Sequence, residues 1–327
     1  MHLQKLLSWL LVLVFISAFL VGCETPGGLT ATEFIPQDAN LIANIQISEI
    51  LNDQDLRDAY DEAEKEAGQP QTFEEALDEL ADEVGIDLRD FSEVVIFADI
   101  ATIAQTGYLG IIVEGSFNKT QFINSIEQQA GQELTTTSYK GYTLYTDAGE
   151  EAGITFLTSR VLLLGTMEAV RDAIDVSKGD QEQLSGIVVD TYNQLGDALI
   201  KVAFELPEEA TDALTEELVP GGIPISLDPF ADIDIVGFAL NKEGEAITIQ
   251  ITPHFLSTDS AQDARDTLSG AISLLRLTLE IPEIDQLLGK VEVSVTDSWV
   301  TIALEITVSE IEWLIEMFQA STTTATR

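Results

Sequence analysis

The sequence has few of the residues that most often carry enzyme chemistry. Its 327 residues include one cysteine and two histidines, and aromatic residues make up only 7% of the chain. A single cysteine excludes an internal disulfide, and two histidines leave little room for a zinc site or for histidine-based catalysis. We therefore expect a non-enzymatic protein with no catalytic residues, no cofactor and no bound metal.

Basic residues are scarce as well. Against 57 Asp and Glu stand 15 Lys and Arg, which gives a formal net charge of −42. Nucleic acid is excluded as a partner because binding its phosphates requires clustered cations. The hydrophobic content of 45% is nevertheless sufficient for a large core, and the length is typical of about two domains.

The first 22 residues have the pattern of a signal peptide. Lys5 is the only basic residue before residue 57, and an uncharged apolar run covers residues 6–20. The run ends in branched apolar residues, a small residue and a cysteine, an order that resembles the lipobox of bacterial lipoproteins. The motif consists of Leu20, Val21, Gly22 and Cys23.

This resemblance implies a lipid anchor. In bacterial lipoproteins, signal peptidase recognises the residues corresponding to Leu20, Val21 and Gly22 and cuts before the cysteine, whose thiol carries a diacylglyceryl group. Cys23 is then the lipidation site, and N-terminal acyl chains hold the protein at the membrane of the cell envelope, facing outside the cytoplasm. Glu24 leaves the choice between inner and outer membrane open. The alternatives are an uncleaved anchor, since residues 6–22 are at the short end of a membrane span, and ordinary secretion.

Two stretches of the chain match in the order and spacing of their predicted elements. A strand beginning at Phe91, a second strand and a helix beginning at Asn118 recur as a strand at Phe230, a second strand and a helix near Ser257. In both stretches the starting points are 27 residues apart. We interpret the match as an internal duplication, with a chance match as the alternative. The predicted organisation is a signal peptide at 1–22, a flexible tether at 23–35, a first repeat at 36–180, a second repeat at 181–319 and a disordered tail at 320–327.

The predicted fold class is α+β, with two related halves of antiparallel sheet and helices packed on one face. Apolar and polar residues alternate over 291–296 and 299–306, a pattern typical of strands with one buried face. Apolar residues recur at helical spacing over 73–84, with acidic residues on the opposite side. A capping box at Thr307 and Glu310 predicts the start of the last helix. Further acidic helices are predicted at 48–67 and 207–218.

Each residue that suggests chemistry also has a simpler structural interpretation. His254 has Ser257 and Asp259 nearby in the sequence but no nucleophile motif, and is better interpreted as a strand-end residue. Trp313 lies in an apolar helix and is interpreted as core rather than as a sugar platform. Acidic groups that would suit calcium match no calcium-binding loop and are interpreted as solvated surface. These groups are Asp147, Glu150 and Glu151; Asn52, Asp53 and Asp55; and Asp228, Asp232 and Asp234.

An apolar segment with three prolines and two glycines covers residues 218–230. It predicts an ordered loop that is either pinned to the core or serves as a lid or contact site. Acidic residues also dominate the exposed faces of the predicted helices. This pattern favours a role of these faces in solubility. The alternative is that they form a docking surface for a basic partner.

Two segments, Pro36–Ile45 and Val161–Ile174, resemble recurring elements of a broad group of exported bacterial proteins of unknown function. The resemblance implies an extracytoplasmic α+β protein without an assigned reaction. The leading hypothesis is a lipid-anchored, non-enzymatic envelope protein whose duplicated body binds a protein partner or an apolar ligand. The alternatives are a carrier of apolar or lipid ligands and, third, a hydrolase that uses carboxylates.

Overall fold

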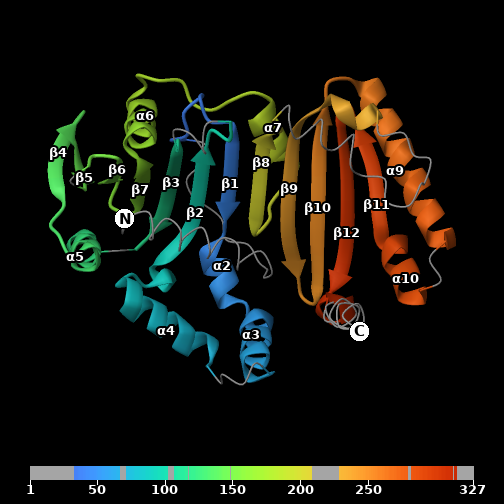
Figure 1. Ribbon diagram of the computed structural model, residues 1–327, viewed down its shortest axis with the longest axis horizontal. Coiled ribbons are helices and arrows are strands. Elements are labelled where there is room, and N and C mark those ends of the chain that lie inside the picture. Colours follow the sequence, from blue (N-terminus) through green and yellow to red (C-terminus); the bar gives the residue numbers. More distant parts are fainter. Residues whose placement is uncertain are drawn as a thin grey trace, which may run out of the picture.

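Among the residues that the structure describes, twelve strands form one antiparallel sheet (Figure 1). The computed structural model describes residues 33–66, 71–101, 107–116, 118–147, 149–207, 228–278, 281–311 and 313–314. The strand order across the sheet is β11-β12-β10-β9-β8-β1-β2-β3-β7-β6-β5-β4. The predicted α+β class is confirmed. The strands are β1 (Leu41–Ile45), β2 (Phe91–Ala98), β3 (Leu109–Gly115), β4 (Thr135–Tyr139), β5 (Tyr142–Thr146), β6 (Ala152–Phe156), β7 (Val161–Thr166), β8 (Ile200–Glu205), β9 (Ile233–Glu243), β10 (Ala246–Phe255), β11 (Val291–Thr296) and β12 (Trp299–Thr307).

The two halves of the sheet meet where β1 pairs with β8. Asn44 of β1 lies opposite Lys201 of β8 in this central pair. From the junction, the first half continues outward through β2, β3 and β7, and the second half through β9, β10 and β12. A helix follows β3 in the first half and β10 in the second. The same outward order in both halves is what the predicted duplication requires.

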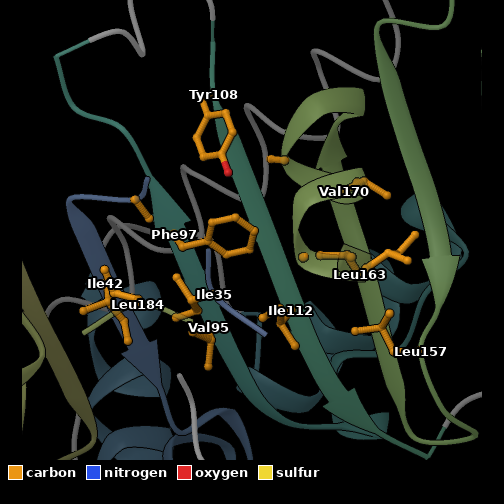
Figure 2. Packing of buried hydrophobic residues seen from close by; sticks show 14 of the residues in the cluster. Ile35, Ile42, Val95, Phe97, Tyr108, Ile112, Leu157, Leu163, Val170 and Leu184 are labelled. Atoms are coloured by element: carbon orange, nitrogen blue, oxygen red, sulfur yellow. The ribbon is translucent and has the colours of Figure 1, made fainter. Parts of the chain in front are cut away.

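Helices cover both faces of the first half of the sheet. Helices α6 and α7 pack on the face that carries Val95 and Phe97, whereas α2 and α5 pack on the face that carries Val94 and Ile96. Figure 2 shows Phe97, Ile112 and Leu163 on neighbouring strands, with Val170 of α6 beside them. The helices are α2 (Ile47–Asn52), α3 (Gln54–Glu66), α4 (Phe73–Val84), α5 (Lys119–Ala130), α6 (Met167–Lys178), α7 (Ile187–Gln194), α9 (Thr258–Thr278) and α10 (Pro282–Lys290), with 3-10 turns η2 (Leu88–Asp90) and η3 (Asp228–Asp232).

This two-sided cover differs from the predicted cover of one face. The physical reason is visible in β2, β3 and β7, which are continuous apolar runs rather than alternating ones. Such strands bury both of their faces. In the second half, where β11 and β12 do alternate, α9 and α10 lie on the apolar side as predicted, but α7 covers the opposite face over β8, β9 and β10.

The helix predicted over residues 48–67 is two helices. Asp53 breaks it with extended backbone angles (φ −74°, ψ 122°), and its carboxylate accepts a hydrogen bond from the backbone N–H of Leu56 at the start of α3. Asp53 therefore acts as a helix cap, a position that aspartate favours.

Several boundaries differ from the predicted ones. Phe230 lies in η3 instead of opening a strand, and β9 begins three residues later. Phe34 and Ile35, assigned to the tether, belong to the fold, because Ile35 is fully buried and its carbonyl accepts a hydrogen bond from Leu184. The sequence analysis did not predict β4, α7 or α10. Most of the predicted helix at 207–218 and loop at 218–230, and the whole tail at 320–327, lie outside the described residues.

Candidate functional site

The predicted lipidation motif, Leu20 to Cys23, lies outside the described residues. The lipid anchor therefore stays a prediction. Within the described part of the chain, no helix combines the length and the apolar character needed to cross a membrane.

Among the described residues, no helix covers one apolar part of the sheet in the second half. Ile251 lies inside β10, between β9 and β12, and yet it is 40% exposed. Ile251 packs in none of the buried apolar clusters, so among the described residues no helix covers its side chain on this face of the sheet. Its cross-strand neighbours on that face are only half-buried. We call this surface the open apolar face, and it comprises Phe238, Ile249, Ile251, Val293, Ile302 and Leu304.

The open apolar face results from the way in which α9 is anchored. Its N-terminal half is fixed by Ala261 and Ala264, which are fully buried against Phe255 and Val300. Its C-terminal half is not, because Leu277 is 84% exposed. In Figure 1, α9 and α10 lie beside β11, at the outer end of the second half. The helices therefore leave part of the β10 and β12 surface uncovered.

The sequence predicts which residues lie on this face, but it does not predict that they are exposed. The alternation over 246–252 and 299–306 correctly places these isoleucines and leucines on one side of the sheet. The same alternation predicts that helices cover that side. Exposure depends on where α9 crosses the sheet, which local patterning does not encode.

A second candidate is a polar cluster at the junction of the two halves. The side-chain amide of Asn44 donates a hydrogen bond to the carboxylate of Glu93, and that of Gln46 donates to the Asn44 side-chain oxygen at 3.0 Å. The ammonium group of Lys201 lies 4.0 Å from the ring centre of Tyr192 on α7, a cation–π contact. The cluster thus joins β1, β2, β8 and α7.

Burial shifts the pKa values of this polar cluster. It raises the pKa of the Glu93 carboxyl, helped by the negative charge of Glu114, and it lowers the pKa of Lys201. It also raises the pKa of the Tyr192 hydroxyl. Opposed shifts of this kind occur at catalytic sites, but also in structural networks. The contacts of Lys201 and Asn44 hold α7 against the junction, which favours a structural role.

Carboxylate pairing at the junction gives little support to the hydrolase alternative. Glu93 and Glu114 are cross-strand neighbours on β2 and β3. Glu114 is bound by Arg160 at 3.1 Å. Glu93 accepts hydrogen bonds from Asn44 and Gln46, so both carboxylates of the pair are held by other side chains.

His254 does not assemble a catalytic triad. Its Nδ1 lies 2.6 Å from Asp234 Oδ1 rather than near Asp259, and Ser257 Oγ contacts Ser260 Oγ at 2.8 Å. The imidazole ring packs against Trp299, with ring centres 4.8 Å apart. This arrangement agrees with the interpretation of His254 as a strand-end residue. Trp313 packs at the margin of an apolar cluster, as predicted for a core residue.

Two of the three acidic groups considered for calcium have other partners, whereas in the third a carboxylate oxygen of Asp147 is buried without a hydrogen-bond partner. Asp53 and Asp55 bind Lys242, Asp234 binds His254, and Asp232 accepts a hydrogen bond from Ser260. Within the described ranges, no group of three or more His, Cys, Asp or Glu side chains could hold a metal ion.

Comparisons with known proteins give a likeness of fold only. No family model matches the chain, and no curated protein matches it. Among solved structures, crystal forms I, III and IV of the protein TP0453 each match 88% of this chain. The match covers 97%, 98% and 97% of the TP0453 chain, respectively. The sequence identities are 8%, 7% and 10%, and the TM-scores are 0.43, 0.45 and 0.45. Identity this low says nothing about function.

Proposed function

We propose that this chain is a lipid-anchored extracytoplasmic envelope protein that acts as a non-enzymatic binding module, with the open apolar face as its binding surface. The observation that carries the proposal is the 40% exposure of Ile251 in the interior of the sheet. The N-terminal acyl chains at Cys23 would hold the module at the membrane, since two or three chains anchor a protein stably without a membrane-spanning helix.

The chemistry of the open apolar face selects an apolar ligand. Its six side chains contain no polar atom, and five of them are aliphatic. An exposed apolar patch marks a binding site in soluble proteins, and here the exposed Ile251 is surrounded by half-buried apolar side chains. The ligand is therefore an apolar molecule or an apolar segment of a partner protein. The aliphatic lining also favours the second candidate, a carrier of lipids, which would bind acyl chains at the same place.

The anchor is tested by fractionation of the bacterial host. The wild-type chain is expected with the membranes and the Cys23→Ala variant with the soluble extracytoplasmic fraction, together with a change in electrophoretic mobility. A Cys23→Ala variant that stays with the membranes at unchanged mobility contradicts the lipid anchor.

The ligand is tested by native mass spectrometry of the unlipidated Cys23→Ser chain purified from the host. A bound lipid of defined mass supports the carrier. A chain without lipid that retains an apolar protein segment after cross-linking supports the protein-binding module. A chain that binds neither contradicts the proposed function.

A further inference from the structure

Strand β11 is one of the two edges of the sheet, and β4 is the other. It pairs with β12 in unbroken register from Val291 to Thr296. Apart from the N–H of Val291, which bonds to the carbonyl of Leu288, the described part of the chain provides no further backbone partner for residues 291–296. Among the described residues, no strand occupies the outer row of N–H and C=O groups of β11.

Edge strands in soluble proteins are normally protected against pairing. The usual devices are proline, charged side chains such as lysine, a bulge, a very short strand or a covering helix. The six residues of β11, VEVSVT, contain one such device, the charged Glu292, and have no proline, no lysine and no register shift. This modest protection leaves β11 open to a partner whose charge complements Glu292.

The two sides of β11 define what could pair with it. Val293 and Val295 point toward α9 and are half-buried, so an added strand would place its alternate side chains beside them. On the opposite side, Glu292 is exposed, and so is Glu305 of the neighbouring strand. Residues 291–307 contain three acids and no Lys or Arg. A complementary strand therefore alternates aliphatic and basic residues.

The opposite edge lacks this combination. The first four residues of β4 are exposed, and its sequence is TTTSY. A strand added there would find no apolar side chains on either face of Thr135 to Ser138 and no acid within the strand. Charge and apolar surface thus distinguish β11 from β4.

We propose that an extended segment of a partner protein, with alternating aliphatic and basic residues, binds along β11 as an additional antiparallel strand. This inference rests on the proposed function of a binding module and names the chemistry of its protein partner. Main-chain hydrogen bonds supply the affinity and the alternating side chains the specificity, as in other cases of β-strand addition.

Amide hydrogen exchange of the full Cys23→Ser chain, followed by NMR, tests this proposal residue by residue. The probe is an acetylated peptide of four Val-Lys repeats. One control is a peptide of four Val-Glu repeats. The other is a peptide with the composition of the probe in which the four valines precede the four lysines, so that the residues do not alternate. We expect the outward amides of β11 to exchange freely in the chain alone and at least tenfold more slowly with the probe. Amides of β4 and both control peptides should show no such effect.

A matched pair of variants tests the charge argument. Glu292→Lys should weaken binding of the Val-Lys peptide at least threefold, whereas Glu133→Lys, an exposed position beside β4, should leave it unchanged. The proposal is overturned if the probe protects the amides of β11 and β4 equally, or if it protects neither strand from exchange. It is also overturned if the Val-Glu peptide binds as well as the Val-Lys peptide. Slow, concentration-dependent exchange of β11 in the chain alone also overturns it, because a second copy then occupies the edge. The proposed function is read out as ligand binding at Ile251 of β10, and this inference as exchange of the outward amides of β11, so the two failures are distinguishable.

Discussion

The ammonium nitrogen of Lys242 lies 2.9 Å from each carboxylate oxygen of Asp53, a residue 189 positions earlier in the chain. Asp55 adds a third contact at 2.6 Å. The Lys242 side chain is 2% exposed and that of Asp53 is 14% exposed, so this pair is largely buried, whereas Asp55 is 54% exposed. It ties the break between α2 and α3, in the first half, to β9 in the second. Burial alone would lower the pKa of Lys242, but its hydrogen bonds to Asp55 and Asp53 outweigh burial and raise that pKa.

We expect Lys242→Met to lower the free energy of unfolding by about 3 kcal/mol, because removing one partner of a buried pair leaves an uncompensated carboxylate. Urea unfolding measures the loss. Lys290→Met is the control, since Lys290 is 39% exposed and pairs with Glu310 at the surface, where such pairs contribute about 1 kcal/mol or less. Equal losses in both variants would show that Lys242 does not join the two halves.

Stability should depend on pH through Glu93. Burial and the charge of Glu114 raise its pKa in the folded state, so the folded chain holds this proton at pH values where the unfolded chain has lost it. The free energy of unfolding therefore falls as pH rises from the ordinary pKa of glutamate, about 4.3, through the folded pKa, and the loss persists at pH 7.

Glu93→Gln removes this loss while keeping an oxygen that accepts the hydrogen bond from Asn44. We expect the variant to be more stable than the parent in urea at pH 7, with the difference narrowing toward pH 4.5. The exposed Glu292→Gln substitution should change stability little at either pH. A Glu93→Gln variant that is less stable at pH 7 would mean that attraction to Lys201 outweighs burial.

Two glycines should respond in opposite ways to alanine. A Cβ at Gly110 on β3 would lie 2.0 Å from the ring of Phe97, which is fully buried. Gly110→Ala should therefore cost about 2 kcal/mol through overpacking. Gly270, inside α9, has nothing within 4 Å of an added Cβ, so Gly270→Ala should stabilise by about 0.5–1 kcal/mol through helix propensity. Thermal unfolding of both variants checks the signs, and a shift of the same sign in both would contradict the packing around Phe97.

Local patterns predicted the local structure well. The alternation over 291–306 predicted β11 and β12, and helical spacing predicted α4 over 73–84. The unbroken apolar runs in β2 and β7 also signalled burial on both faces, although the sequence analysis did not use that signal. Short elements such as α7, whose eight residues have no side-chain cap, gave too weak a pattern.

The candidate site could not be predicted from local sequence patterns. The contact between Lys242 and Asp53 and the exposure of Ile251 both depend on elements that are distant in sequence. Nothing near Ile251 distinguishes it from Ile247, which is 3% exposed on the same strand and the same face. Ile247 is buried because it packs in the apolar cluster that contains Ile50, Leu56 and Leu287, whereas Ile251 packs in none of the apolar clusters.

The most direct test of the binding surface compares two isoleucines of equal exposure on opposite faces. Ile251 on the open apolar face is 40% exposed, and Ile187 on α7 is 38% exposed. Fluorescence of a naphthalene sulfonate probe of apolar surface is titrated with the Cys23→Ser chain and with its Ile251→Asp and Ile187→Asp variants, each confirmed as folded by circular dichroism. Our account predicts that Ile251→Asp weakens probe binding at least tenfold and that Ile187→Asp leaves it within twofold of the parent. Equal binding by all three chains would contradict the assignment of the open apolar face as the binding surface.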